Sequence, residues 1–142
     1  MRLSANFTLD EFTKTSHPSL QDEPSLQVCH NLVYLCAHVL QPLRDALKRP
    51  VVITSGYRSE ALNKFVGGVY DSYHRRGLAA DLRCSTDSEA RVMFQILKKN
   101  PFVDCVLYER GKRSRWLHVQ TCRDRLPRGL ANFYHIPSHE KG

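Results

Sequence analysis

Two short apolar runs, LAADLRC and WLHVQT, restrict the fold of this chain more than any other part of its sequence. Side chains alternate between the two faces of a β-strand. In the second run, Leu117 and Val119 therefore share one face, and His118 lies on the other. Asp81 holds the corresponding polar position in the first run. We predict two strands that pack apolar side chains on a core and present an aspartate and a histidine on the opposite face.

The remaining pattern predicts helices early and strands scattered along the rest of the chain. An apolar stripe at steps of three and four predicts one long helix from Ser25 to about Leu47, with a kink or break near Leu40 because Pro42 interrupts it. Further expected elements are short helices after Thr8 and over 59–66, a helix over 86–99, and strands at 51–55 and 105–109.

The loop RGKRSR joins the last two strand candidates and favours a hairpin between them. Helices followed by scattered strands, at least one pair of them antiparallel, indicate an α+β fold. A chain of 142 residues with 42% hydrophobic content suits one domain with one core. We place that domain at residues 1–122 and expect a basic, partly disordered tail at residues 123–142.

Composition narrows the function classes. The net charge of +7 favours polyanions such as nucleic acid, anionic lipid or an anionic cell wall, but there is no nucleic-acid-binding motif. We therefore expect no nucleic-acid partner. No apolar run approaches the length of a membrane span, and the N-terminus lacks the apolar stretch of a secretory signal. This favours synthesis in the cytoplasm without signal-driven export, unless a leader has been trimmed.

Cysteine usage speaks against a thiolate metal site. The five cysteines form no close Cys-x-x-Cys pair, and reduced thiols fit a cytoplasmic origin. His74, Asp81 and His118 form a different candidate set, because zinc accepts imidazole nitrogen and carboxylate oxygen. Each residue taken alone has an ordinary alternative: a strand histidine is usually a polar surface residue, and a lone aspartate is usually a cap.

A longer pattern surrounds these three residues. The block SGYRSEALNKFVGG, followed by SYHRRGLAADL and later by WLHV, resembles the zinc D-Ala-D-Ala carboxypeptidases and related cell-wall endopeptidases. NFTLDEF and VLQPLRDAL also resemble the N-terminal part of small phage and bacterial members, so the resemblance covers roughly residues 3 to 121. The resemblance implies the fold that these enzymes share with the hedgehog signalling domain: a small, mostly antiparallel sheet with helices packed on one side.

The resemblance also implies roles for individual residues. His74, Asp81 and His118 match the three zinc ligands of the family, which implies one zinc ion per chain. Arg58 matches an arginine that reaches into the site, where it can hold a substrate carboxylate or the developing oxyanion. Ser72 matches a serine that lines the site, where it can bind substrate or support a ligand, although a simple turn hydroxyl is a nearly equal alternative.

The general base is the point at which this sequence departs from the family pattern. Family members carry a Glu or Asp shortly before the last histidine ligand, often three positions ahead, and here that position is Arg115. Glu109 is the nearest acid upstream and is our candidate for the base. The alternative is that Glu109 pairs with the basic loop and that the base lies elsewhere or is missing.

These features predict a zinc metallopeptidase that cleaves peptidoglycan peptides containing D-amino acids, as a D,D-carboxypeptidase or as a cross-link or stem endopeptidase. Its partners would be peptidoglycan peptides, and we expect a monomer. A phage lysin that acts on the cell wall and a cytoplasmic peptide-recycling enzyme both fit the sequence. The competing class is a non-catalytic zinc-containing binding module or a phage structural or assembly protein on the same fold.

Overall fold

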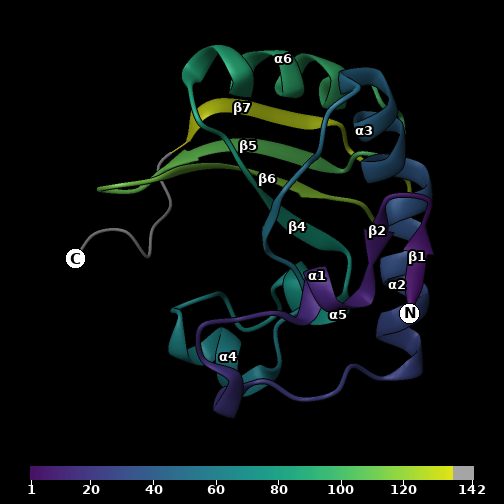
Figure 1. Ribbon diagram of the computed structural model, residues 1–142, viewed down its shortest axis with the longest axis vertical. Helices are drawn as coiled ribbons and strands as arrows, with labels where there is room; N and C mark the ends of the chain where they lie inside the picture. The colour runs from purple at the N-terminus through teal and green to yellow at the C-terminus, as the bar shows by residue number, and fades with distance from the viewer. Residues whose placement is uncertain (136–142) are drawn as a thin grey trace.

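The computed structural model describes residues 1–135 and confirms the α+β class. Its centre is a five-stranded sheet in the order β3-β4-β6-β5-β7 (Figure 1). The neighbouring strands are antiparallel except for β5 and β7, which are parallel. The strand bounds are β3 Ile53–Ser55, β4 Ala79–Arg83, β5 Cys105–Arg110, β6 Arg115–Gln120 and β7 Leu130–His135. A separate two-stranded sheet joins β1 (Arg2–Ser4) to β2 (Phe7–Thr8).

The larger helices form the second layer. Figure 1 shows α6 lying along the sheet beside α3, with α2 descending at the side. Three short helices, α1, α4 and α5, gather around the end of the sheet formed by β3 and β4. The helix bounds are α1 Leu9–Thr13, the 3₁₀ helix Pro18–Leu20, α2 Leu26–Leu35, α3 Gln41–Leu47, α4 Glu60–Phe65, α5 Tyr73–Arg76 and α6 Asp87–Lys98.

The expected break before Pro42 takes the form of a π-helical turn at Cys36–Leu40. Such a turn holds one extra residue, so it moves the buried face of the helix by one position. The steps of three and four placed Leu26, Cys29 and Val33 on the stripe before the turn. That part of the prediction is wrong, because Leu26 and Val33 are exposed while Leu32 and Leu35 are buried. The stripe is correct after the turn, where Leu40 and Leu43 are buried.

The register of the central strands confirms the predicted faces. Leu117 and Val119 of β6 are completely buried in the main core, on the face covered by α6. On the other face, His118 lies directly opposite Asp81 of β4. The sheet thus separates an apolar layer from a polar one, and the polar face carries the candidate ligands.

The boundary predicted at residue 122 is wrong, because the following residues belong to the same domain. β7 pairs with β5 in the sheet, and the backbone N–H of Leu130 donates a hydrogen bond to the carbonyl oxygen of Asp104. The side chain of Asp104 is fully buried and accepts hydrogen bonds from Arg125 and Arg128. The arginines expected in a tail therefore neutralise a buried carboxylate. Residues 136–142 lie outside the described part of the chain.

None of the five cysteines forms a disulfide, and four of them are buried. Within residues 1–135, no helix is both long enough and apolar enough to cross a membrane.

Replacing Asp104 with Asn should lower the free energy of unfolding by about 1.5–3 kcal/mol at neutral pH, because the hydrogen bonds to a charged acceptor are weakened. Burial favours the neutral carboxyl, but the hydrogen bonds from Arg125 and Arg128 outweigh it and hold the pKa of Asp104 well below its usual range. The stabilisation is therefore present above about pH 3.9 and is lost as the pH falls toward the folded-state pKa.

Denaturant unfolding of wild type and Asp104→Asn at neutral pH and near pH 3 measures this difference. The exposed Asp71, replaced by Asn, is the matched control and should show little difference at either pH. An equal destabilisation by Asp104→Asn at both pH values would contradict the charge-based explanation.

Candidate metal centre

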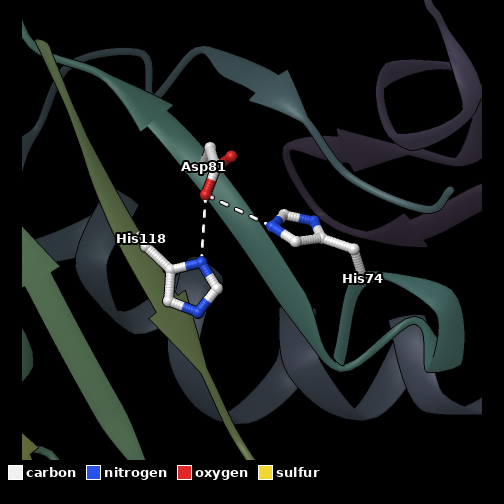
Figure 2. Close-up of side chains that lie close together, drawn as sticks. All are labelled: His74, Asp81 and His118. Atoms are coloured by element: carbon white, nitrogen blue, oxygen red, sulfur yellow. Dashed lines mark hydrogen bonds and ion pairs between the residues drawn. The ribbon is translucent and has the colours of Figure 1, made fainter. Parts of the chain in front are cut away.

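Three segments that are distant in sequence bring the predicted ligands together. Asp81 comes from β4, His118 from the neighbouring strand β6, and His74 from the short helix α5 (Figure 2). One possible ligand atom of each lies within 4.8 Å of the others. The side chains are 4%, 11% and 14% exposed for His74, Asp81 and His118 respectively. The structure therefore forms a compact, nearly enclosed group of two imidazoles and one carboxylate.

Helix α5 owes its position to the residues at its two ends. The hydroxyl of Ser72 accepts a hydrogen bond from the backbone N–H of His74 and caps the helix N-terminus. Gly77 ends the helix with φ of 76°, and a Cβ there would come within 2.8 Å of the carbonyl oxygen of Val28. Only glycine meets both demands. Ser72 thus helps to place His74, and its role in substrate binding stays a prediction.

The outer hydrogen bond of His74 decides which of its nitrogens faces the centre. Nδ1 lies 2.7 Å from the carbonyl oxygen of Gly56, which can only accept, so Nδ1 carries the proton. Burial lowers the pKa of His74, which favours the neutral ring. Nε2 then presents a lone pair 3.3 Å from Oδ1 of Asp81. Two acceptor atoms at this distance require a cation or a proton between them.

His118 presents its other nitrogen to the same oxygen. Nδ1 lies 3.1 Å from Oδ1 of Asp81, and Nε2 lies 2.8 Å from Oε1 of Gln120. With the Nε2 proton donated to Gln120, Nδ1 is free to act as an acceptor. Two imidazole lone pairs and one carboxylate oxygen then converge, which is the donor set that zinc accepts. The residues present therefore fit a metal ion.

The charge balance of the group supports the same conclusion. Burial opposes the charged form of Asp81, but the interactions with His74 and His118 outweigh it and hold its pKa well below the usual range. The pKa of His118 is raised overall: burial acts to lower it, but the hydrogen bond with Asp81 and the negative charge of Asp81 lead the interactions that together have the larger effect. A buried carboxylate thus holds positive charge at Oδ1, and a metal cation would take the place of an imidazole proton.

Arg58 contacts the second oxygen of the same carboxylate. Its Nη2 lies 3.5 Å from Oδ2 of Asp81, while Nε and Nη1 donate to Ser55 and Asn63. This ion pair leaves Oδ1 for the metal side and fixes the guanidinium in a single orientation. Arg58 also lines a cavity of about 260 Å³ together with Ser55 and Tyr57, so one side of it remains accessible.

Glu109 lies on the same face of the sheet as the candidate ligands. Its strand partner is Trp116, whose indole Nε1 donates a hydrogen bond of 3.1 Å to Oε1 of Glu109. The carboxylate is buried. Burial lowers the pKa of Arg58, and the charges of Asp81 and then Glu109 oppose this shift. For His118, the charge of Glu109 adds to the upward effect of Asp81. In the register of β5 and β6, Leu107 is the residue opposite His118, and Glu109 is two positions further along β5 on the diagonal.

Arg115, at the position where the family pattern has an acid, points to the opposite face of β6. Its guanidinium donates hydrogen bonds to Asp87 at the start of α6 and to the hydroxyl of Tyr108. Arg115 therefore anchors the hairpin to the helical layer and takes no part in the metal centre.

Comparison with known proteins agrees with this geometry. The model of the peptidase M15 family matches residues 5–120. The chain belongs to the peptidase M15 family. Membership implies a metallopeptidase, and enzymes of this family typically use zinc. A search of curated proteins gives no significant match. The fold brings together the three residues that the resemblance to this family marks as ligands.

Sequence reasoning missed the groups that orient the ligands. The carbonyl of Gly56 gives no sequence signal, because any residue has one. Gln120 did give a signal, since the alternation in β6 places it on the same face as His118. Asp104 lies outside any motif, and only the folded sheet brings it within 2.9 Å of Gln120.

The purified protein should contain about one zinc ion per chain, and His74→Ala and Asp81→Ala should each lose it, because two remaining ligands hold zinc poorly. Elemental mass spectrometry measures the metal content. The exposed His30, replaced by Ala, is the matched control and should keep the metal. Full zinc content in both ligand variants would show that the metal binds elsewhere.

Proposed function

We propose that this protein is a zinc-dependent peptidase that hydrolyses peptidoglycan peptides containing D-amino acids, as a D,D-carboxypeptidase or as a cross-link or stem endopeptidase. The observation that carries the proposal is the convergence of three acceptor atoms from His74, Asp81 and His118. Arg58 pairs with Asp81, and Glu109 lies on the same face of the sheet. Peptide hydrolysis needs an activated water, a proton acceptor and a positive group near the carbonyl, and this arrangement can supply each of them.

A zinc ion held by the three ligands would polarise the substrate carbonyl and lower the pKa of its bound water. Glu109 takes the proton from the attacking water and passes it to the leaving amine. The hydrogen bond from Trp116 fixes one oxygen of this carboxylate. The positive charge of Arg58 interacts favourably with the negative charge of Glu109.

Arg58 has a second role in the proposal. Its guanidinium lies between the ligand Asp81 and an open cavity, so it can contact both the metal centre and a bound peptide. There it holds a substrate carboxylate or the negative oxygen that develops on the scissile carbonyl. A second cavity, of about 440 Å³, is lined by Thr54 and Trp116, and Thr54 lines both cavities.

The preference for peptides with D-residues rests on the family resemblance and on charge. A net charge of +7 attracts anionic wall material and anionic peptide ends. We therefore propose the bacterial cell wall as the place of action and a monomer as the active form, with synthesis in the cytoplasm preceding release to the wall.

Replacing Glu109 with Gln should lower the rate of peptide hydrolysis by about 10²- to 10⁴-fold, because the amide cannot accept the proton of the attacking water. Its oxygen can still accept the indole hydrogen bond, so zinc content and folding should be kept. The measurement is the release of new amino groups from purified peptidoglycan and from synthetic peptides ending in D-Ala-D-Ala, with zinc content determined on the same samples.

The exposed Glu60, which pairs with Arg75 on the surface, supplies the control variant Glu60→Gln and should hydrolyse at the wild-type rate. Full activity of Glu109→Gln would exclude Glu109 as the base. A zinc-loaded wild type that releases no amino groups from any of these substrates would favour the non-catalytic binding module.

A further inference from the structure

A chain of hydrogen bonds leads away from the metal centre to a second buried carboxylate. His118 Nε2 pairs with Gln120 Oε1 at 2.8 Å, and Gln120 Nε2 donates to Oδ2 of Asp104 at 2.9 Å. We infer that Gln120 and Asp104 are positioning residues that set the metal-binding tautomer of His118. The inference rests on the metal-binding part of the proposed function and goes beyond it to residues that touch neither metal nor substrate.

The direction of each hydrogen bond follows from chemistry. An ionised carboxylate only accepts hydrogen bonds, so the group of Gln120 that faces Asp104 must be its NH₂. The amide oxygen of Gln120 then faces His118 and can only accept, so Nε2 of His118 must carry the proton. Nδ1 is left with its lone pair directed at the metal side. Metal-bound histidines commonly depend on such an outer hydrogen bond.

Asp104 can keep this role because its charge and position are both fixed. Oδ2 also accepts from Arg125 and Arg128, and Oδ1 accepts from the same two side chains and from the backbone N–H of Arg128. These donors hold the carboxylate in its ionised form although it is fully buried. A protonated or turned Asp104 could accept the Gln120 amide in either orientation.

Both arginines lie beyond residues 5–120, the part of the chain that matches the family. Arg125 also donates to the hydroxyl of Tyr73, the residue that precedes the ligand His74. The segment after β6 therefore supports the centre from its outer side, through Asp104 and Gln120 on one path and through Tyr73 on the other. This gives residues 123–128 a role in metal binding that their basic composition alone does not suggest.

The decisive experiment measures zinc affinity by chelator competition, together with the melting temperature of the metal-free protein. Gln120→Leu removes the acceptor for His118 Nε2 and should weaken zinc binding about 10- to 100-fold. Asp104→Asn should weaken it in the same direction, because an Asn amide can donate to Gln120 and let the Gln120 amide turn its NH₂ toward His118. In the Gln120→Leu background, Asp104→Asn should add no further loss of affinity, since its path to His118 is already broken.

The control is Thr121→Val, next to Gln120 in the chain. Thr121 is fully buried and its hydroxyl donates to the carbonyl oxygen of Phe102, so this variant also loses a buried hydrogen bond but has no contact with His118. It should lower the melting temperature and leave zinc affinity unchanged. Equal loss of affinity in Thr121→Val and Gln120→Leu would overturn the inference, as would additive losses from Gln120→Leu and Asp104→Asn.

The readout separates this inference from the proposed peptidase activity. A wild type that binds zinc but hydrolyses nothing removes the proposed activity, and the affinity differences among the variants still test the positioning role. A wild type that binds no zinc overturns the inference together with the metal centre.

Discussion

The buried carboxylate of Asp81 is the interaction on which the arrangement of this protein depends. One of its oxygens faces two imidazole nitrogens, and the other faces the guanidinium of Arg58. A buried carboxylate is tolerated only when partners compensate it, because an unpaired charge would carry a desolvation penalty comparable to the whole free energy of folding. Asp81 itself comes from β4. Helix α5 contributes His74 and β6 contributes His118, while Ser55 of β3 accepts a hydrogen bond from Arg58.

The second buried carboxylate, Asp104, repeats the same principle at the far end of β6. Two arginines from the segment before β7 neutralise it, and Gln120 connects it to His118. The candidate ligands thus lie between two charged groups: Arg58 on the side of the cavity and Asp104 on the side of the C-terminal segment. Such outer contacts hold a ligand in one rotamer and one tautomer, which is what a metal site with few protein ligands requires.

Much of the architecture could be predicted because it depends on local pattern. The alternation in LAADLRC and WLHVQT gave the correct faces of β4 and β6, and the helix expected over 86–99 is α6. The helical stripe was placed correctly only after the π-helical turn, since period counting assumes an unbroken helix. β7 was missed because its sequence is poorly patterned and its pairing with β5 is a contact between segments distant in sequence.

The sequence by itself determined which residues can bind a metal, because residue type and strand alternation fix the chemistry and the face of Asp81 and His118. The tertiary structure alone decided which nitrogen of each histidine points inward, because the tautomer depends on partners at Gly56 and Gln120. It also decided that Glu109 lies on the same face of the sheet as His118, because the hairpin register pairs Glu109 with Trp116. These outcomes depend on contacts between strands, and such contacts exist only after the chain has folded.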